Sequence, residues 1–433
     1  MDLLTANDRQ GEYPASYYAA TAEHLTRFPA ATGEFTCDVC VVGAGFTGLS
    51  TAYHLAQRGY DVVVLDAQRV GFGASGRNGG QVSMGQRRDQ DELEAMVGDT
   101  HARALWDIGC QAVDLVRDLC AKDEVRTTFH PGILHTVHRQ RDHVHNHAFA
   151  AHMQTKYGYD KISVLEPDAC REIVNSPAYH GGTLDMGSGH VNPLELVLGL
   201  GRLAEKAGAR IFEGSKVIGV AEGDPATVTT DQATIKARFV VLGCNGYLGR
   251  MHKHVAARVM PINNFIVATA PMSPNAQEDI IRHNYAVADS KFVVNYFRFS
   301  DDHRLLFGGG ESYGYKFPAD ITKTVRKPLT LIFPQLKDVV IDHAWGGTLG
   351  ITMNRMPHYE RIGGNILTMS GFSGSGVALG TLSGQIAAEA IAGQAERFDI
   401  MAQVPTAAFP GGPTLRSPLL VLAMLWYGLR DRL

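Results

Sequence analysis

The sequence lacks the features of a secreted, disulfide-stabilised protein and of a nucleic-acid-binding protein. Its 433 residues include six cysteines without the paired spacing of a disulfide framework. Lysine and arginine number 40 against 44 aspartate and glutamate, so the net charge of −4 gives no basic surface for nucleic acid. Hydrophobic residues make up 45% and charged residues 19%, which is ordinary for a globular protein. A chain of this length predicts two packed domains.

Long apolar runs are also missing. The first dozen residues carry charged side chains, among them Asp2 and Arg9, so we expect no signal peptide. The most apolar segment is 419–429 (LLVLAMLWYGL), whereas a bilayer span needs about 20 residues. Ser417 and Pro418 occupy the positions of an N-cap and a first helical residue. We therefore expect a docked C-terminal helix rather than a membrane contact, and a cytoplasmic location.

A strand–loop–helix–strand unit occupies residues 38–66. After a short apolar strand, Gly43, Gly45 and Gly48 form the pattern G-x-G-x-x-G, followed by an apolar helical pattern and a second strand. Such glycines allow a tight turn, close approach to a pyrophosphate and close packing of helix on strand. Asp66 ends the second strand, where an acidic side chain about 20 residues further on accepts ribose hydroxyls. The unit predicts a Rossmann-type dinucleotide site.

Two further glycine-rich segments lie far apart in the chain. Residues 71–81 read GFGASGRNGGQ, and residues 365–377 read NILTMSGFSGSGV before a helical pattern at 378–392. Glycine lets backbone approach a large planar ligand. A helix N-terminus offers N–H groups to electron-rich atoms. Two such loops suit a long dinucleotide held at both ends.

These segments resemble the D-amino-acid-oxidase (DAO) family of FAD enzymes. The resemblance extends from about residue 38 to residue 393. It is carried by ASGRNGGQ at 74–81, NYFR at 295–298, RLLFGGG at 304–310, WGGT at 345–348 and GFSGSGVALGTLSGQIAAEAI at 371–391. Within the family, residues 13–20 and 70–73 are most similar to the branch that oxidises γ-glutamylputrescine.

The resemblance implies an α/β fold, in which a Rossmann-type FAD-binding domain carries an inserted α+β substrate domain with an antiparallel sheet. Alternating apolar residues at 261–270 and 291–308 indicate strands of that sheet. We expect an N-terminal extension at 1–35. The expected FAD-binding domain comprises 36–125, 185–255 and 345–433, and the expected substrate or cap domain comprises 126–184 and 256–344.

Residues expected to hold FAD lie on the glycine segments and on one strand that meets the adenine in relatives. They are Gly43, Gly45, Phe46, Thr47, Gly48, Asp66, Ala67, Gly73, Ala74, Ser75, Arg77, Asn78, Gly79, Gly80, Gln81, Val217, Gly371, Phe372, Ser373, Gly374, Ser375, Gly376 and Val377. The glycine loop lacks a histidine and the stretch after Trp345 lacks a cysteine, so the resemblance favours noncovalent FAD, although His190 or His343 could lie near the ring.

Four residues are candidates for contact with substrate. Tyr296 and Arg298 alternate on one predicted strand and face the same side. Arg298 could hold a carboxylate or pair with a neighbouring aspartate on the surface. Trp345 could pack at the flavin or fill the core. His190 lies on a segment that approaches the cofactor in related enzymes.

Histidines are concentrated between residues 130 and 152. His143, His145 and His147 alternate, and on a helix these three would point in different directions. No carboxylate or cysteine partner has the spacing of a metal site. We therefore expect a polar surface and no metal.

Only one dinucleotide fingerprint is present, so the substrate itself must reduce the flavin, and oxygen, a quinone or another acceptor must reoxidise it. The resemblance implies oxidation of an amine to an imine that hydrolyses to an aldehyde. γ-Glutamylputrescine, in polyamine catabolism with oxygen as acceptor, is the favoured substrate. Two alternatives stay open: an enzyme for N-methyl or cyclic amino acids such as sarcosine or proline, and an FAD electron-transfer subunit with a protein or quinone partner.

Overall fold

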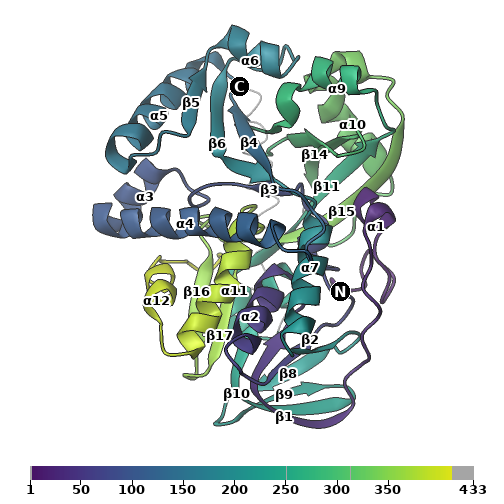
Figure 1. Ribbon diagram of the computed structural model, residues 1–433, viewed down its shortest axis with the longest axis vertical. Coiled ribbons are helices and arrows are strands. Elements are labelled where there is room, and N and C mark those ends of the chain that lie inside the picture. Colours follow the sequence, from purple (N-terminus) through teal and green to yellow (C-terminus); the bar gives the residue numbers. More distant parts are fainter. Residues whose placement is uncertain (1, 250, 313, 412–433) are drawn as a thin grey trace.

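The computed structural model of the protein describes residues 2–249, 251–312 and 314–411. Two β-sheets are arranged one above the other in Figure 1, with helices against each. The expected α/β architecture with a second, antiparallel-rich sheet is confirmed. The C-terminal helix expected at 419–429 lies outside the described residues.

The first sheet has eight strands in the described part of the chain, in the order β16-β17-β10-β1-β2-β7, with β9 and β8 continuing from β10. Its strands are β1 (Gly33–Val42), β2 (Val62–Leu65), β7 (Arg210–Phe212), β8 (Val217–Ala221), β9 (Ala226–Thr230), β10 (Ala233–Leu242), β16 (His358–Ile362) and β17 (Ile366–Ser370). The pairs β1–β2, β1–β10, β2–β7 and β10–β17 are parallel. All four residues of β2 are buried, as expected for a parallel strand that is covered on both faces.

Helices from distant parts of the chain cover one face of this sheet. They are α2 (Phe46–Ala56), α7 (Pro193–Lys206) and α11 (Ala378–Ile391), and Figure 1 shows them side by side. Helix α4 (Asp99–Cys120) crosses above α11, and α12 (Glu396–Ala402) lies beside α11. Local sequence explains the start of α7, because Pro193 begins the helix and the Asn192 side chain accepts from two backbone N–H groups.

A glycine divides the helical segment between Gln90 and Cys120 in two. Gly98 has φ +81° and separates α3 (Gln90–Val97) from α4. A glycine with positive φ ends a helix at little steric cost.

The second sheet has nine strands within the described residues, in the order β15-β11-β14-β13-β12-β4-β6-β3, with β5 paired to β6. Its strands are β3 (Gln81–Val82), β4 (His130–Thr136), β5 (Ile162–Leu165), β6 (Gly182–His190), β11 (Met260–Thr269), β12 (Ala286–Asp289), β13 (Tyr296–Phe299), β14 (Leu305–Ser312) and β15 (Ile341–Ile351). All pairs are antiparallel except β12–β4.

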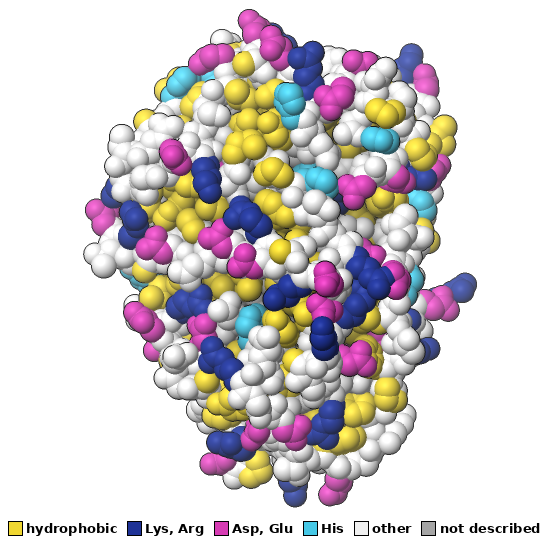
Figure 2. Space-filling model, in the orientation of Figure 1, with side chains coloured by type: hydrophobic (Ala, Val, Ile, Leu, Met, Phe, Trp, Pro, Cys, Tyr) yellow, Lys and Arg dark blue, Asp and Glu magenta, His cyan; other side chains and the backbone are white. Residues whose placement is uncertain are grey.

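The remaining helices are mostly short. They are α1 (Tyr17–Thr21), α5 (His143–Tyr157), α6 (Pro167–Ile173), α8 (Lys253–Arg258), α9 (Pro274–Ile280) and α10 (Ile321–Ile332). In the part of the chain that the structure describes, no helix is long and apolar enough to cross a bilayer. Positive and negative side chains are interspersed over the face in Figure 2.

Two of the expected domain boundaries fall inside strands of the second sheet. A boundary at 185 falls inside β6, and a boundary at 345 falls inside β15. Both strands belong to the second sheet along their whole length. Alternation and turn residues reveal a strand, but they do not reveal which of two sheets the strand joins.

Candidate functional site

A cavity of about 780 Å³ is lined by residues from both sheets. The ends of β1, β2 and β10 open into it at Gly43, Asp66 and Cys244. Open sheets of parallel strands bind ligands at the carboxyl ends of the strands, where neighbouring connections diverge. The cavity therefore lies where the first sheet predicts a ligand site.

The glycines of the first loop are required by close contacts. A Cβ on Gly48 would lie 1.8 Å from the carbonyl oxygen of Gly43, and a Cβ on Gly45 would lie 2.8 Å from Oγ of Ser75. Gly43 itself has φ +104°. Helix α2 begins at Phe46, whose N–H donates to Oγ of Ser75 at 3.0 Å. The loop thus brings bare backbone and a helix N-terminus to the cavity, as a pyrophosphate requires.

Asp66 lies at the end of β2 and lines the cavity. One of its carboxylate oxygens accepts from the N–H of Ala44 at 2.7 Å, and the other accepts from the N–H of Gln68 at 2.7 Å. Burial raises the pKa of Asp66 to about 6, although both N–H donors lower it. The carboxylate is held in one orientation, and its remaining lone pairs are able to accept hydroxyl groups.

Arg77 lines the cavity with its charge already paired. Its guanidinium donates to both carboxylate oxygens of Asp8, at 2.9 and 3.0 Å, and its Nε donates to the carbonyl of Phe72 at 2.7 Å. Asp8 belongs to the N-terminal extension, where Tyr13 also donates to the carbonyl of Val70. The extension packs against the cofactor-side domain through these contacts.

Most of the residues predicted to hold FAD are brought together at this cavity. Those that line it are Gly43, Gly45, Phe46, Thr47, Asp66, Ala67, Gly73, Ala74, Ser75, Arg77, Asn78, Gly79, Gln81, Val217, Phe372, Ser373, Gly374, Ser375, Gly376 and Val377. Gly48, Gly80 and Gly371 are not among the lining residues. Gly371 has φ +79°, and its N–H donates to Oδ1 of Asn245 at 2.8 Å, so it shapes the loop instead.

Tyr296 is the one candidate for substrate contact that lines the cavity among the described residues. Its hydroxyl donates to Oδ1 of Asn264 at 2.5 Å. Its ring lies against Gly79 and Gly308, where added Cβ atoms would approach within 2.6 and 2.1 Å respectively. The two glycines leave room for the aromatic ring.

Arg298 does not line the cavity. Its guanidinium is buried and donates to the carbonyls of Gly79, Val191 and Phe299 at 2.8, 2.9 and 3.1 Å. It also donates to the hydroxyl of Tyr18 at 3.2 Å. The buried side chain therefore joins three backbone segments next to the cavity instead of forming a surface ion pair, and its role as a carboxylate ligand stays a prediction.

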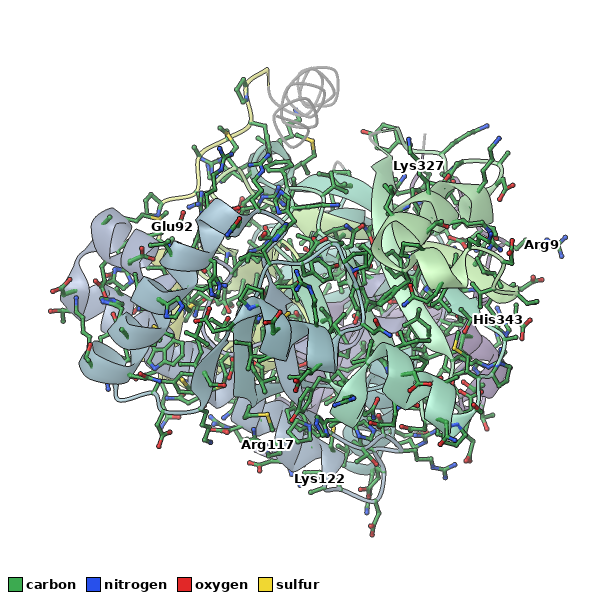
Figure 3. All side chains as sticks on the ribbon, turned by 90° about the horizontal axis from the view of Figure 1, so that it is seen from above. Arg9, Glu92, Arg117, Lys122, Lys327 and His343 are labelled. Atoms are coloured by element: carbon green, nitrogen blue, oxygen red, sulfur yellow. The ribbon has the colours of Figure 1, made fainter. Side chains whose placement is uncertain are left out.

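Trp345 and His190 are also absent from the described lining residues. Trp345 is buried, packs edge-on against Tyr18, and donates from Nε1 to the carbonyl of Arg77 at 3.0 Å. His190 is fully buried and hydrogen-bonded through Nε2 to the carbonyl of Asn284 at 2.8 Å. Burial and, to a smaller extent, the positive charge of Arg298 lower the pKa of His190 to about 3. Figure 3 shows His343 at the outer edge of the molecule, and it too does not line the cavity.

Sequence reasoning missed three arginines that line the cavity, Arg87, Arg88 and Arg355, of which Arg88 is paired with Glu92 at 3.0 Å. Nε of Arg87 donates to the carbonyl of Ser373 at 3.0 Å, and the Arg355 guanidinium lies 5.4 Å from the ring centre of Phe292. Burial lowers the pKa of Arg87, and so does the positive charge of Arg355. Guanidinium groups bind carboxylates and phosphates by charge-assisted hydrogen bonds, so an anion suits this part of the cavity. Arg355 follows closely on the family-like WGGT segment, which was the only available signal.

Another part of the cavity has an apolar wall with a few carboxylates. Its apolar side chains come from α4, α5, β5 and the loop before β5, and they are Trp106, Phe149, Met153, Tyr159 and Ile162. Asp89 and His145 also line this part and lie 3.5 Å apart. The hydrogen bond between them lowers the pKa of Asp89 and raises the pKa of His145.

Comparisons with known proteins agree with this arrangement. The family model described as "DAO: FAD dependent oxidoreductase" matches residues 38–390. The chain is 38% identical over 423 residues to the gamma-glutamylputrescine oxidoreductase of Escherichia coli K12, covering 98% of this chain and 99% of that one. It is 41% identical over 421 residues to the probable oxidoreductase OrdL of Rhizobium meliloti, covering 96% and 97% of the two chains.

Solved structures show the same fold. Glycine oxidase from Geobacillus kaustophilus matches with a TM-score of 0.70 at 18% identity, over 83% of this chain and 95% of that one. L-Proline dehydrogenase from P. horikoshii matches with a TM-score of 0.69 at 22% identity, over 83% and 94%.

The cavity fits the cofactor that the family uses. Bare glycine backbone, a helix N-terminus and a fixed carboxylate lie together at the ends of parallel strands, as a dinucleotide requires. The prediction of an FAD-dependent enzyme that acts on CH–NH or CH–NH2 donors is confirmed at the level of the family. The chain belongs to the DAO family of FAD-dependent oxidoreductases.

Proposed function

We propose that the protein oxidises the primary amine of γ-glutamylputrescine to an imine, which hydrolyses to an aldehyde and ammonia. Oxygen is the proposed acceptor of the two electrons, giving hydrogen peroxide, and polyamine catabolism is the proposed pathway. The alignment with the E. coli enzyme, which covers nearly the full length of both chains, supports this substrate.

One structural observation carries the proposal: a single cavity combines an arginine pair with an apolar wall. γ-Glutamylputrescine has a carboxylate at its amino-acid end and an amine at the end of an apolar four-carbon chain. Arg87 and Arg355 are suited to the carboxylate, since guanidinium groups bind carboxylates by charge-assisted hydrogen bonds. Trp106, Phe149 and Met153 are suited to the carbon chain.

The residues proposed to hold FAD, without a covalent bond, are the cavity-lining members of the three glycine segments together with Asp66 and Val217. Bound FAD supplies the acceptor for a hydride from the carbon next to the amine nitrogen. The apolar wall disfavours the charged ammonium form by desolvation, so the nitrogen lone pair is available when the hydride leaves. Tyr296, fixed by Asn264, is proposed to orient the reacting end.

The test is to purify the holoprotein without added cofactor and mix it anaerobically with γ-glutamylputrescine, putrescine, sarcosine and proline in turn. Flavin absorbance near roughly 450 nm reports reduction. Fast bleaching by γ-glutamylputrescine alone supports the proposal, whereas bleaching by sarcosine or proline instead assigns the enzyme to N-methyl or cyclic amino acids. Absence of flavin absorbance would contradict the cofactor proposal itself.

Readmitting oxygen to the reduced protein tests the acceptor. Rapid recovery of absorbance with formation of hydrogen peroxide supports an oxidase. Slow recovery that is accelerated by a quinone would show an electron-transfer role and replace oxygen as the acceptor.

A further inference from the structure

A cluster of two histidines and a glutamate lies outside the cavity, on the far side of α5. Nε2 of His143 lies 3.1 Å from Oε2 of Glu166, and Nε2 of His147 lies 3.0 Å from Oε1 of the same carboxylate. The three ligand atoms all lie within 4.8 Å of one another. The two imidazole rings are 4.9 Å apart and nearly perpendicular.

We propose that His143, His147 and Glu166 bind a zinc-class divalent metal ion that fixes the first turn of α5 to the second sheet. Histidines at positions i and i+4 share one face of a helix and form a recurring zinc-binding pair. Two nitrogen ligands and one carboxylate leave a fourth tetrahedral position for water. Calcium and magnesium are disfavoured, because they take oxygen ligands almost exclusively.

The geometry needs little rearrangement to accept the ion. Tetrahedral zinc with ligands at about 2.1 Å separates neighbouring ligand atoms by about 3.4 Å, slightly more than the present nitrogen–oxygen distances. The His143 ring is held in place by packing on Gly181, where an added Cβ would lie 2.6 Å from its Cε1. The side chains of His147 and Glu166 are 52% and 65% exposed, so the ion and its water ligand have access from solvent.

The sequence predicted no metal here, because His143, His145 and His147 do not converge as a set of three. The structure separates them into two roles. His143 and His147 point to Glu166, whereas His145 lines the cavity and lies beside Asp89. The missing carboxylate comes from the start of α6, directly after β5 of the second sheet.

The location suggests what the ion would do. Helix α5 also supplies part of the cavity wall, through His145, Asn146, Phe149 and Met153. Figure 1 shows α5 beside β5 and close to α6 at one end of the molecule. A metal bridge from the first turn of α5 to Glu166 would therefore limit movement of that wall.

A second cluster, His254, His358 and Glu360, provides a matched control. There both imidazoles contact a single carboxylate oxygen, at 2.8 and 3.0 Å. The positive charge of Arg258 acts on this cluster and opposes a cation. The two clusters contain the same residue types. Loss of a histidine from the second cluster therefore serves as a control for loss of a histidine from the first.

The experiment is a Zn2+ titration of chelator-treated holoprotein in competition with a chromophoric chelator, using wild type, His147→Ala, Glu166→Gln and His254→Ala. We expect wild type and His254→Ala to bind zinc equally. His147→Ala and Glu166→Gln should weaken zinc binding by at least about 100-fold. Loss of a residue that only supports a metal ligand costs up to about 100-fold in affinity, and loss of a ligand itself should cost no less. Equal binding by all four proteins, or loss in His254→Ala alone, would overturn the site. If His147→Ala does not fold, Glu166→Gln, which preserves side-chain volume, decides.

Hydrogen exchange tests whether bound zinc also restricts the movement of α5. Zinc should slow amide exchange in residues 143–157 of wild type and His254→Ala, but not of Glu166→Gln. Zinc that binds at this cluster without slowing exchange in α5 would overturn the proposed fixing of the cavity wall.

Discussion

Replacing His190 by glutamine should make the protein less sensitive to acid. His190 is fully buried at the end of β6, and its Nε2 is hydrogen-bonded to the carbonyl of Asn284. Burial lowers its pKa to about 3, with a smaller contribution from Arg298. An unfolded histidine titrates near a pKa of about 6.5. Glutamine keeps a donor for Asn284 and has no charge to gain.

The sign and size of the effect follow from linkage. Above pH 6.5 the histidine is neutral in both the folded and the unfolded state, so it contributes no pH dependence. Between the two pKa values only the unfolded state binds the proton, so folding stability falls as the pH falls, by about 1.4 kcal/mol per pH unit. From pH 7 to pH 5, His190 should lower the free energy of unfolding by about 2 kcal/mol.

The assay is urea unfolding at pH 7 and pH 5 with excess FAD, comparing wild type with His190→Gln. The variant should lose about 2 kcal/mol less than wild type over this range, whatever its stability at pH 7. His101→Gln is the control, because His101 also contacts a backbone carbonyl, that of Ile400, but from a partly exposed helix position. Equal pH dependence in wild type and His190→Gln would refute the reasoning.

Three further predictions concern the cofactor and the substrate. Gly48→Ala should abolish FAD binding or folding, because its Cβ would lie 1.8 Å from a carbonyl oxygen. Gly219→Ala is the control, because its Cβ would meet open space, and it should keep full flavin absorbance. FAD affinity should fall as the pH drops below about 6, where Asp66 becomes protonated, and Asp66→Asn should bind FAD weakly at every pH in a fluorescence titration. Arg355→Gln should raise KM for γ-glutamylputrescine by about 10- to 100-fold, the loss of a charged hydrogen bond, and should leave KM for putrescine unchanged in peroxide assays; equal effects on both amines would contradict the carboxylate role.

The cofactor half of the site could be predicted because its signals are local. Gly43, Gly45 and Gly48 lie within one turn and the start of one helix, and the close contact between Gly43 and Gly48 follows from that short stretch. Asp66 ends the next strand, which pairs directly with the first. A sequence pattern of about 30 residues therefore contains nearly all of the geometry that it specifies.

The substrate half could not be predicted in the same way. Arg87 and Arg355 belong to segments far apart in the chain, and only the folded chain brings both of them to one cavity. Arg298 shows the same limit of sequence patterns. Alternation correctly placed it on a strand with Tyr296, but its three carbonyl acceptors come from β13 and two separate loops, which no periodicity reveals.

Helix α5 contributes both to the proposed substrate cavity and to the proposed metal site. Only Ala150, Met153 and Tyr157 of its 15 residues are buried, so apolar packing holds it weakly. Its other connections are polar: His145 contacts Asp89, His152 contacts Glu94, and two histidines contact Glu166. A helix with few buried apolar contacts opens locally at a lower free-energy cost than the core elements do. The wall that is proposed to contact the carbon chain of the substrate is thus held largely by ionisable side chains. A metal ion bound at Glu166 would therefore change the shape of the cavity through α5.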